Sequence, residues 1–263
     1  MFHTVKNGTL EYEIADCLEG AVHCFSTRLG GVSTGALSSL NLGTSRGDDP
    51  QNVLRNYEIL GSAVGFAPRQ TVFTKQEHTD VIRVVDESFC GEGLERPVSQ
   101  ICDAQITNCP GVALVCFSAD CTPILLYDPV KKAIGAVHAG WRGTAQNIAG
   151  KAVDAMVEHF GCCRDDLQAA IGPCISKCCF ETDWDVPEAL LGLMGNKAST
   201  AITEVGGKYH VDLKFCNGLL LQKAGIGGLD ISPDCTMCQS DRYWSHRKVG
   251  NARGSQIGLI MLK

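Results

Sequence analysis

The sequence has no run of basic residues longer than a pair, and its 29 acidic residues outnumber 23 basic ones, giving a formal net charge of -6. Nucleic acids and anionic membrane surfaces bind clustered lysine and arginine, so this composition argues against both as partners. No apolar stretch reaches the roughly 20 residues of a membrane-spanning helix. The first segment, MFHTVKNGTLEYEIADCLEG, lacks the apolar core of a signal peptide. We therefore expect a cytoplasmic protein.

Nucleotide-binding motifs, repeats and linkers are also missing. No G-x-G-x-x-G follows a predicted strand and no Walker A sequence occurs, which argues against a Rossmann or P-loop site. There is no low-complexity linker and no repeat of fixed period. Because 263 residues are enough to bury one large core, we expect a single domain over residues 1–263.

Cysteine, in contrast, is abundant, with 15 residues. An odd number cannot pair completely within the chain, so we expect free thiols, metal ligands or small apolar core residues. Four cysteines lie in apolar surroundings and are predicted to be core residues: Cys24, Cys102, Cys116 and Cys216.

One cysteine pair has the spacing of a metal or redox motif. Cys235 and Cys238 form a C-x-x-C, which is common as half of a structural zinc site or as a redox pair. The second half of such a zinc site is matched only loosely by CISKCC, residues 174–179. The sequence therefore favours no metal at this pair.

Apolar patterning predicts more strands than helices. Helices are expected over 50–65, started by Asp49 and Pro50, over 144–160, capped by Thr144, and over 212–226, opened by Asp212. Strands are expected over 21–27, 71–78, 81–86, 132–140, 167–172, 228–232 and 256–262, and on both sides of a break at Ser118–Asp120 within 111–129. The expected fold class is α/β, or mixed α+β, with β-sheets in the core and helices on the outer faces.

Three possible metal ligands lie where predicted strands end: His78 in TKQEHTD, Cys121 in SADCTP and His138 in AVHAGWRG. Two imidazoles and a thiolate suit Zn²⁺, and three protein ligands leave a fourth position for water or substrate, as in catalytic zinc sites. Candidates for the hydrogen bonds that orient the imidazoles are Asp80, Asp120 and Gln76.

Other interpretations of the same residues stay open. Cys121 could act as a nucleophile with His138 as its base, in a hydrolase without metal. His138 could instead simply end a core strand, and Cys121 could be a buried thiol. Arginines nearby in the sequence raise a further possibility. Arg247 and Arg253 in RYWSHRKVGNARGSQ, with Arg28 in FSTRLGG, could bind an oxyanion if they point inward.

A series of longer motifs runs in order from about residue 22 to the C-terminus: FSTRLGGVS, SLNLG, KQEH, DAQITNCPGVALVCFSADCTPILLYD, AVHAGWRGT, IGPCI and YWSHRKVGNARGSQIG. Together they resemble the YfiH-like family, first called laccase-domain or polyphenol oxidase proteins and later described as purine nucleoside phosphorylases. The resemblance implies one α/β domain of layered sheets with helices outside. It also implies a metal site formed by His78, Cys121 and His138.

The activities that the resemblance implies are phosphorolysis of inosine, adenosine and methylthioadenosine to free base and sugar 1-phosphate, with adenosine deamination beside it. The implied cofactor is Zn²⁺, or copper, and the implied partners are purine nucleosides and phosphate, with the chain as a monomer or small homo-oligomer. A copper phenol oxidase needs several coppers, whereas only one mononuclear site can be assembled. A zinc-binding or docking protein without catalysis is a further alternative. Thr79, His246 and Ala252 differ from the residues usual at these positions of the family's motifs, which leaves the substrate preference open.

Roles follow for the remaining candidates. We expect Arg28 and Arg247 to hold phosphate, and Asn41 and Asp120 to meet polar atoms of the ribose or base. Asp120 is the candidate proton shuttle. Gln76, Arg253 and Trp141 complete the expected substrate contacts, with Trp141 either stacking on the purine or packing under its turn. Small residues around His138 are expected to allow a sharp turn beside a metal, and a helix starting near Thr144 would add partial positive charge for an oxyanion.

Overall fold

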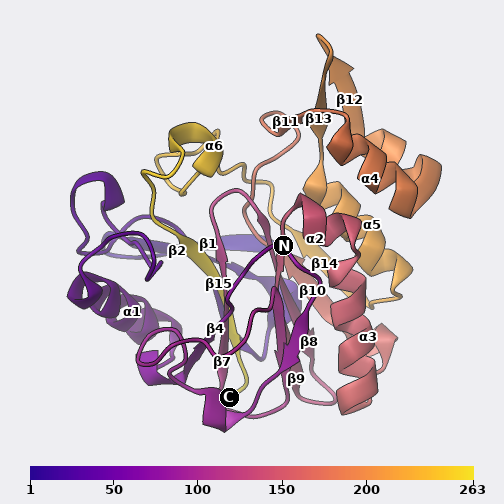
Figure 1. Cartoon of the computed structure of the whole chain (residues 1–263). Helices are drawn as coiled ribbons and strands as arrows, with labels where there is room; N and C mark the ends of the chain where they lie inside the picture. Colours follow the sequence, from indigo (N-terminus) through magenta and orange to yellow (C-terminus); the bar gives the residue numbers. More distant parts are fainter.

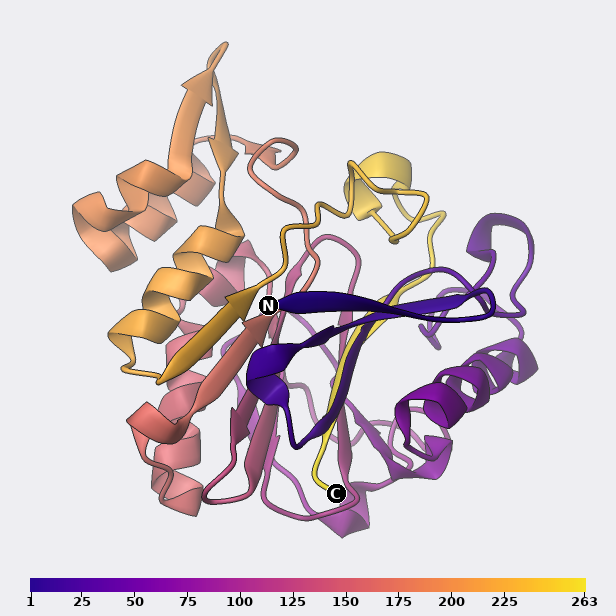
Figure 2. The ribbon, with the colours of Figure 1, turned by 180° about the vertical axis from the view of Figure 1, so that it is seen from behind.

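Two six-stranded β-sheets pack face to face in the computed structural model, which describes all 263 residues. Helices cover the two outer faces, so that the chain forms a single layered domain. Figure 1 shows the strands between helix α1 (Pro50–Val64) on one side and helix α3 (Ile148–Phe160) on the other. Figure 2 gives the same arrangement from behind, with α1 in purple and helices α3, α4 (Asp185–Met194) and α5 (Leu213–Lys223) on the opposite side.

The first sheet joins both ends of the chain. Its strand order is β1 (Phe2–Asn7), β2 (Leu10–Ala15), β3 (Val22–Ser26), β15 (Gln256–Met261), β7 (Ala113–Ser118) and β4 (Thr71–Phe73). All neighbours are antiparallel except β4 and β7, which are parallel. The last strand of the chain therefore lies in the middle of the sheet.

The second sheet carries the hairpin around which the candidate site is built. Its order is β14 (Gly228–Ile231), β10 (Gln168–Ile171), β8 (Thr122–Asp128), β9 (Ala133–Ala139), β6 (Ala104–Thr107) and β5 (Ile82–Val84). The central strands β10, β8, β9 and β6 are antiparallel to one another, and the two edge strands are parallel to their neighbours. A small third sheet contains β11 (Glu181–Thr182), β13 (Lys208–Val211) and β12 (Ile202–Val205).

Six α-helices connect and cover the strands: α1 (Pro50–Val64), α2 (Trp141–Ala145), α3 (Ile148–Phe160), α4 (Asp185–Met194), α5 (Leu213–Lys223) and α6 (His246–Val249). Short 3₁₀ helices span Asp16–Leu18, Gly35–Leu37, Pro68–Gln70, Glu87–Phe89, Arg164–Asp166 and Gly195–Ala201. No helix combines the length and hydrophobicity that crossing a bilayer requires.

The buried side chains explain the layers. Strand side chains alternate, so that Leu114 faces the second sheet while Val115 faces α1. Between the two sheets, residues such as Phe25 and Leu125 share one core. The apolar stripe of α3 closes a second core on the far face of the second sheet, and Met156 is fully buried there. The prediction of sheets inside and helices outside is confirmed.

Several sequence expectations hold in detail. The side chain of Asp49 accepts a hydrogen bond from the backbone N–H of Gln51 at the start of α1, and Asp212 does the same for Phe215 at the start of α5. The four cysteines predicted to be core residues are all fully buried: Cys24, Cys102, Cys116 and Cys216. All 15 thiols are free.

Two predicted elements differ from the structure. The helix expected over 144–160 is two helices, because Asn147 adopts a left-handed φ of 60° between α2 and α3. Thr144 therefore lies inside α2 and caps nothing; its hydroxyl instead accepts a hydrogen bond from Asn217. The strand expected over 71–78 ends at Phe73, and the following residues form a loop.

Candidate functional site

The three predicted metal ligands meet at one end of the two sheets. His78 lies in the loop after β4, Cys121 precedes β8, and His138 is near the end of β9. The β8–β9 pairing places Pro123 opposite His138, which brings the neighbouring Cys121 to the same point. Cys121 Sγ lies 3.7 Å from His78 Nε2, and one ligand atom from each residue lies within 4.8 Å of the others. This His–Cys–His site could bind one metal ion.

A buried carboxylate that the sequence analysis missed orients the site. Asp103 Oδ1 lies 2.8 Å from Nδ1 of His138, which leaves Nε2 free for a metal, and it also accepts a hydrogen bond from the backbone N–H of His78. Its other oxygen accepts from the backbone and hydroxyl of Thr79. A carboxylate behind a ligating imidazole is a usual feature of zinc sites. Asp80, one of the predicted orienting residues, instead pairs with Lys151.

The tight turn after His138 is required by the site. A Cβ atom at Gly140 would lie 2.6 Å from Cδ2 of His78 and 3.3 Å from Sγ of Cys121. Only glycine therefore lets the backbone pass beside the ligands. His78 and Asp120 also adopt left-handed φ values of 61° and 98°, which are costly for residues with a Cβ. Such concentrated strain is typical of functional sites.

Electrostatics favour a thiolate in this site. Burial raises the pKa of Cys121, but the charges and hydrogen bonds of His138 and His78 outweigh it and lower the pKa to about 6. Burial lowers the pKa of His138, but Cys121 and Asp103 raise it to about 9. A thiolate is the form in which cysteine binds metals, so the donor set fits a metal such as zinc.

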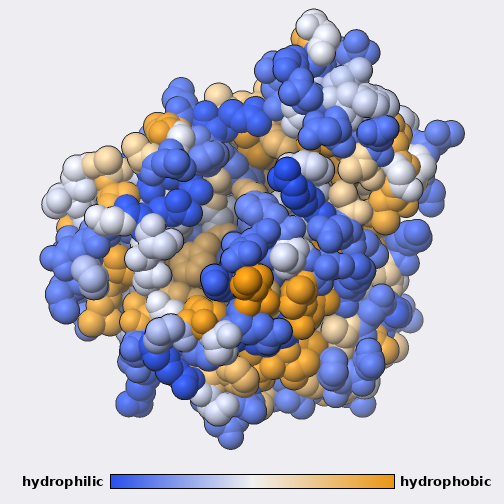
Figure 3. All heavy atoms as spheres, viewed as in Figure 1, coloured by the Kyte–Doolittle hydropathy of each residue, from blue (hydrophilic) through white to orange (hydrophobic).

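The site opens into a cavity of about 640 Å³. Figure 3 shows the face of the molecule hollowed near its centre, beside the part that carries α1. The cavity walls carry three cationic side chains, Arg46, Lys75 and Arg253, and no carboxylate. The rings of Phe73 and Phe117 form an apolar wall, with their centres 4.9 Å apart and their planes nearly perpendicular.

The positive charges of Arg46 and Arg253 in the cavity wall are only partly compensated by neighbouring groups. Nε of Arg253 is buried without a hydrogen-bond partner, while its Nη1 donates to the backbone oxygen of Gly254. Burial, and next the charge of Arg46, lower the pKa of Arg253 to about 10. An unpaired buried donor beside a second cation is a suitable environment for an anion. Arg46 is a further residue that the sequence analysis missed, although it is the single cation in the turn-rich segment TSRGDD.

Two predicted substrate contacts support the cavity through hydrogen bonds of their own. Gln76 lines the cavity, but its amide group bonds to both backbone groups of Phe117. Asn41 is fully buried, and its side-chain oxygen accepts from the backbone N–H groups of Gly43 and Ser255. Asn41 thus holds the loop that carries Arg46 against the segment that carries Arg253.

Three predicted contacts lie outside the cavity lining. The guanidinium of Arg28 stacks 3.9 Å above the ring of Trp244 and donates to the backbone of Ser38. Arg247 donates to the backbone oxygens of Cys179 and Glu181. Trp141 packs against the apolar cluster under α4, which is the packing role that the sequence analysis weighed against stacking.

Asp120 directly precedes the ligand Cys121, but its carboxylate is engaged elsewhere. Oδ1 accepts a hydrogen bond of 2.6 Å from the hydroxyl of Thr236, and Oδ2 accepts one of 2.6 Å from the backbone N–H of Arg247. This side chain therefore ties the loop of Cys121 to the segment before α6.

Comparison with known proteins shows the family to which the chain belongs. The family model described as multi-copper polyphenol oxidoreductase laccase matches residues 22–263. A protein of Bacteroides thetaiotaomicron named purine nucleoside phosphorylase is 31% identical, and the alignment covers 96% of each chain. A prokaryotic protein named adenosine deaminase RL5 is 33% identical, with 90% of this chain and 92% of that protein covered.

Longer relatives and solved structures complete the comparison. The mouse protein named purine nucleoside phosphorylase LACC1 is 33% identical over 92% of this chain, but the chain spans only 56% of its length. The crystal structure of the Bacillus licheniformis hypothetical protein YfiH superimposes with a TM-score of 0.94 at 30% identity, covering 99% of both chains. The resemblance carried by the motifs is thus confirmed, and the chain belongs to the laccase-like YfiH/YlmD family, whose curated relatives include proteins named purine nucleoside phosphorylase.

Proposed function

We propose that this protein is a zinc-dependent purine nucleoside phosphorylase that acts on inosine, adenosine and methylthioadenosine. One observation carries the proposal: a single cavity joins the His–Cys–His site to the guanidinium groups of Arg46 and Arg253 and has no carboxylate in its lining. The names of the relatives support the same reaction class. The free thiols also suit a reducing cytoplasm.

Phosphate binds at the two arginines in this proposal. Guanidinium groups match phosphate oxygens with paired hydrogen bonds. Because Nε of Arg253 has no hydrogen-bond partner, it can donate to phosphate without first breaking another hydrogen bond. This assignment places phosphate at Arg46 and Arg253. Arg28 and Arg247 lie outside the cavity lining, and their guanidinium groups donate to backbone oxygens instead.

The purine lies against the partly exposed ring of Phe117, with the buried ring of Phe73 packed behind it, since flat aromatic surfaces stack or pack edge-on with favourable energy. This orientation directs C1′ of the ribose toward the arginines. A phosphate oxygen bonds to C1′ as the bond from C1′ to the purine nitrogen breaks. The proton of hydrogen phosphate ends on the released base, so that atoms and charge balance.

The chain's own residues hold the reacting groups in place. Asp103 fixes the ring of His138, and Gly140 leaves room for His78 beside Cys121. Asp120 acts as a positioning residue through its bonds to Thr236 and to the backbone of Arg247. When bound to the three ligands, zinc supplies a Lewis acid beside the purine.

Adenosine deamination is a second candidate activity, favoured by the open three-ligand set and by the relative named adenosine deaminase. It consumes water and releases ammonia, and it needs no phosphate. Replacement of the arginines therefore separates the two reactions. Arg253→Ala should weaken phosphorolysis strongly and leave deamination within a few-fold.

The test is release of hypoxanthine from inosine by the purified protein, with and without phosphate. We expect phosphate-dependent release that Cys121→Ser abolishes. Arg253→Ala should raise the KM for phosphate at least about tenfold, the loss of one charged hydrogen-bonded contact. Arg55→Ala is the matched control, because Arg55 is exposed on α1 and pairs only with Glu58.

Other outcomes would replace the proposal. Base release that ignores phosphate, survives chelators and stops on thiol alkylation would indicate the metal-free Cys/His hydrolase. Oxygen consumption with phenols after copper loading, without base release, would indicate the oxidase. Bound metal without any turnover would indicate a binding protein.

A further inference from the structure

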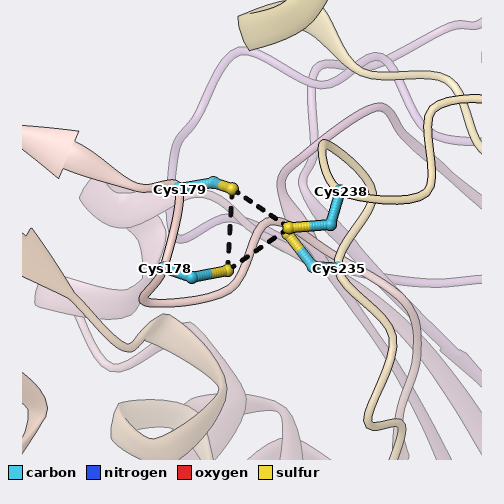
Figure 4. Close-up of side chains that lie close together, drawn as sticks. All are labelled: Cys178, Cys179, Cys235 and Cys238. Carbon is cyan, nitrogen blue, oxygen red and sulfur yellow. Dashed lines mark hydrogen bonds between the residues drawn. The ribbon is translucent and has the colours of Figure 1, made fainter.

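A second cluster of cysteines lies outside the cavity lining. Cys178 and Cys179 lie in the loop between β10 and β11, and Cys235 and Cys238 lie between β14 and α6. Figure 4 shows the four side chains converging on one point. All four Sγ atoms lie within 4.8 Å of one another. The prediction of no metal at the C-x-x-C pair followed from sequence spacing, which does not show that residues 174–179 fold against the pair.

The distances match a tetrahedral thiolate site. Sγ of Cys238 lies 3.6 Å from that of Cys178 and 3.3 Å from that of Cys179, and the latter two are 3.6 Å apart. Four sulfurs each bonded to zinc at about 2.3 Å are separated by about 3.8 Å at the tetrahedral angle. A disulfide needs about 2.05 Å. The arrangement is therefore that of ligands around a common centre.

The protein already stabilises negative charge in this cluster. The backbone N–H of Ser176 donates to Sγ of Cys235 at 3.3 Å. Cys235 is itself buried, so its sulfur is shielded from water. Four thiolates gathered within 4.8 Å of one another repel each other when no cation lies between them. A divalent cation resolves that repulsion.

We propose that Cys178, Cys179, Cys235 and Cys238 form a second metal site, a structural zinc tetrathiolate distinct from the His–Cys–His site. Four protein ligands leave no position for substrate, which is the pattern of structural zinc. Three of the four cysteines are at least partly exposed, so the metal can enter from solvent.

Such a site would act as a clamp between two segments that also support the cavity. The segment of Cys235 carries Thr236, whose hydroxyl binds Asp120 beside the ligand Cys121. The loop of Cys179 accepts a hydrogen bond from Arg247, whose own N–H binds the same carboxylate. Zinc in the cluster would fix both ends of this hydrogen-bond network.

The experiment is zinc analysis of protein purified under reducing conditions. Wild type and Cys163→Ser should each hold about two zinc ions per chain, and Cys178→Ser/Cys238→Ser and Cys121→Ser/His78→Ala about one each. Cys163 is a matched control because it is exposed and lies outside both clusters. Cys178→Ser/Cys238→Ser should also lose several degrees in Tm, whereas Cys163→Ser should not.

Cobalt substitution keeps the test decisive if Cys178→Ser/Cys238→Ser fails to fold. Cobalt in the Cys121→Ser/His78→Ala protein should give the intense sulfur-to-metal charge-transfer bands of a four-thiolate site. The proposal is overturned if that protein binds no cobalt, or if wild type holds about one zinc that Cys121→Ser/His78→Ala removes. Mapping of a disulfide within the cluster in the reduced preparation would overturn it too. None of these results depends on the activity proposed above, because the measured quantity is metal, not turnover.

Discussion

Gly140 shows how closely one residue can determine a site. It contributes no functional group, yet its missing side chain is the space in which His78 approaches Cys121. The sequence predicted the need for small residues in this turn, because an imidazole there demanded a sharp backbone path. It could not show which glycine faces the ligands, since that depends on how the loop of His78 folds over β9.

Gly140→Ala is expected to remove metal from the His–Cys–His site while leaving the fold intact. The new methyl group would lie 2.6 Å from the His78 ring, and an exposed ring can move away at low cost, taking its nitrogen out of position. We expect at least about a tenfold loss of zinc affinity at this site, as for other changes in ligand orientation. Zinc titration with a competing chelator, beside the circular dichroism spectrum, measures both effects.

Gly192→Ala is the control for this prediction. A Cβ at Gly192, in α4, would meet no atom within 4 Å, so the variant should bind zinc like the wild type. Normal zinc affinity in Gly140→Ala would show that the close approach of its backbone is unimportant.

At the scale of helices and strands, some elements were predicted from the sequence and others were missed. Strands β7, β8, β9 and β15 were predicted because both of their faces are buried and they read as continuous apolar runs. Strand β1 was missed because it is largely exposed and lacks that pattern. The ligands were found at strand ends, but Asp103 and Arg46 were not. Their importance comes from which side chains the packed sheets place opposite them, and no local pattern records that.

One interaction between elements makes stability depend on pH. Glu13 in β2 is buried, and its Oε1 accepts a hydrogen bond of 2.6 Å from the hydroxyl of Tyr243. Asp234 and Arg242 also face it. Burial raises the pKa of Glu13 to about 7, from the ordinary 4.5 of an exposed glutamate. The folded protein therefore holds a proton here that the unfolded chain releases.

Because the folded-state pKa is the higher one, the stabilising contribution is complete below about pH 4.5 and is lost as pH rises through 7. Glu13→Gln cannot ionise. We expect the free energy of unfolding of this variant to rise relative to that of the wild type between pH 5 and pH 8, by up to about 3 kcal/mol. Urea denaturation at several pH values measures the difference. Glu204→Gln, at an exposed position in β12, should show no such trend; parallel curves for Glu13→Gln and wild type would refute the argument.

At the scale of the whole molecule, the chain ends and the layers are interlocked. Strand β15 lies between β3 and β7, so the first sheet cannot form without the last residues of the chain. The third sheet and α4 share an apolar core with residues of α5. We therefore propose that residues 1–263 behave as one cooperative domain.

This proposal predicts a single unfolding transition in scanning calorimetry of the zinc-loaded protein. The calorimetric enthalpy should equal the van't Hoff enthalpy, as for a two-state domain. A separate early transition, with proteolytic cleavage confined to the third sheet and α4, would show instead that this part unfolds by itself.

The uncompensated arginines of the cavity have a thermodynamic cost when no anion is bound. Arg46 and Arg253 repel each other, and one buried donor of Arg253 is unpaired, so the ligand-free protein gives up stability in order to keep a binding surface ready. Arg253→Met should therefore melt at a higher temperature than the wild type in phosphate-free buffer. Saturating phosphate should shift that order toward the wild type, since ligand at 100 times its Kd stabilises the wild type by about 2.7 kcal/mol and stabilises a variant that binds at least about tenfold more weakly by about half of that or less. A melting curve with and without phosphate would thus reveal how much folding stability the cavity gives up for binding, without any assay of turnover.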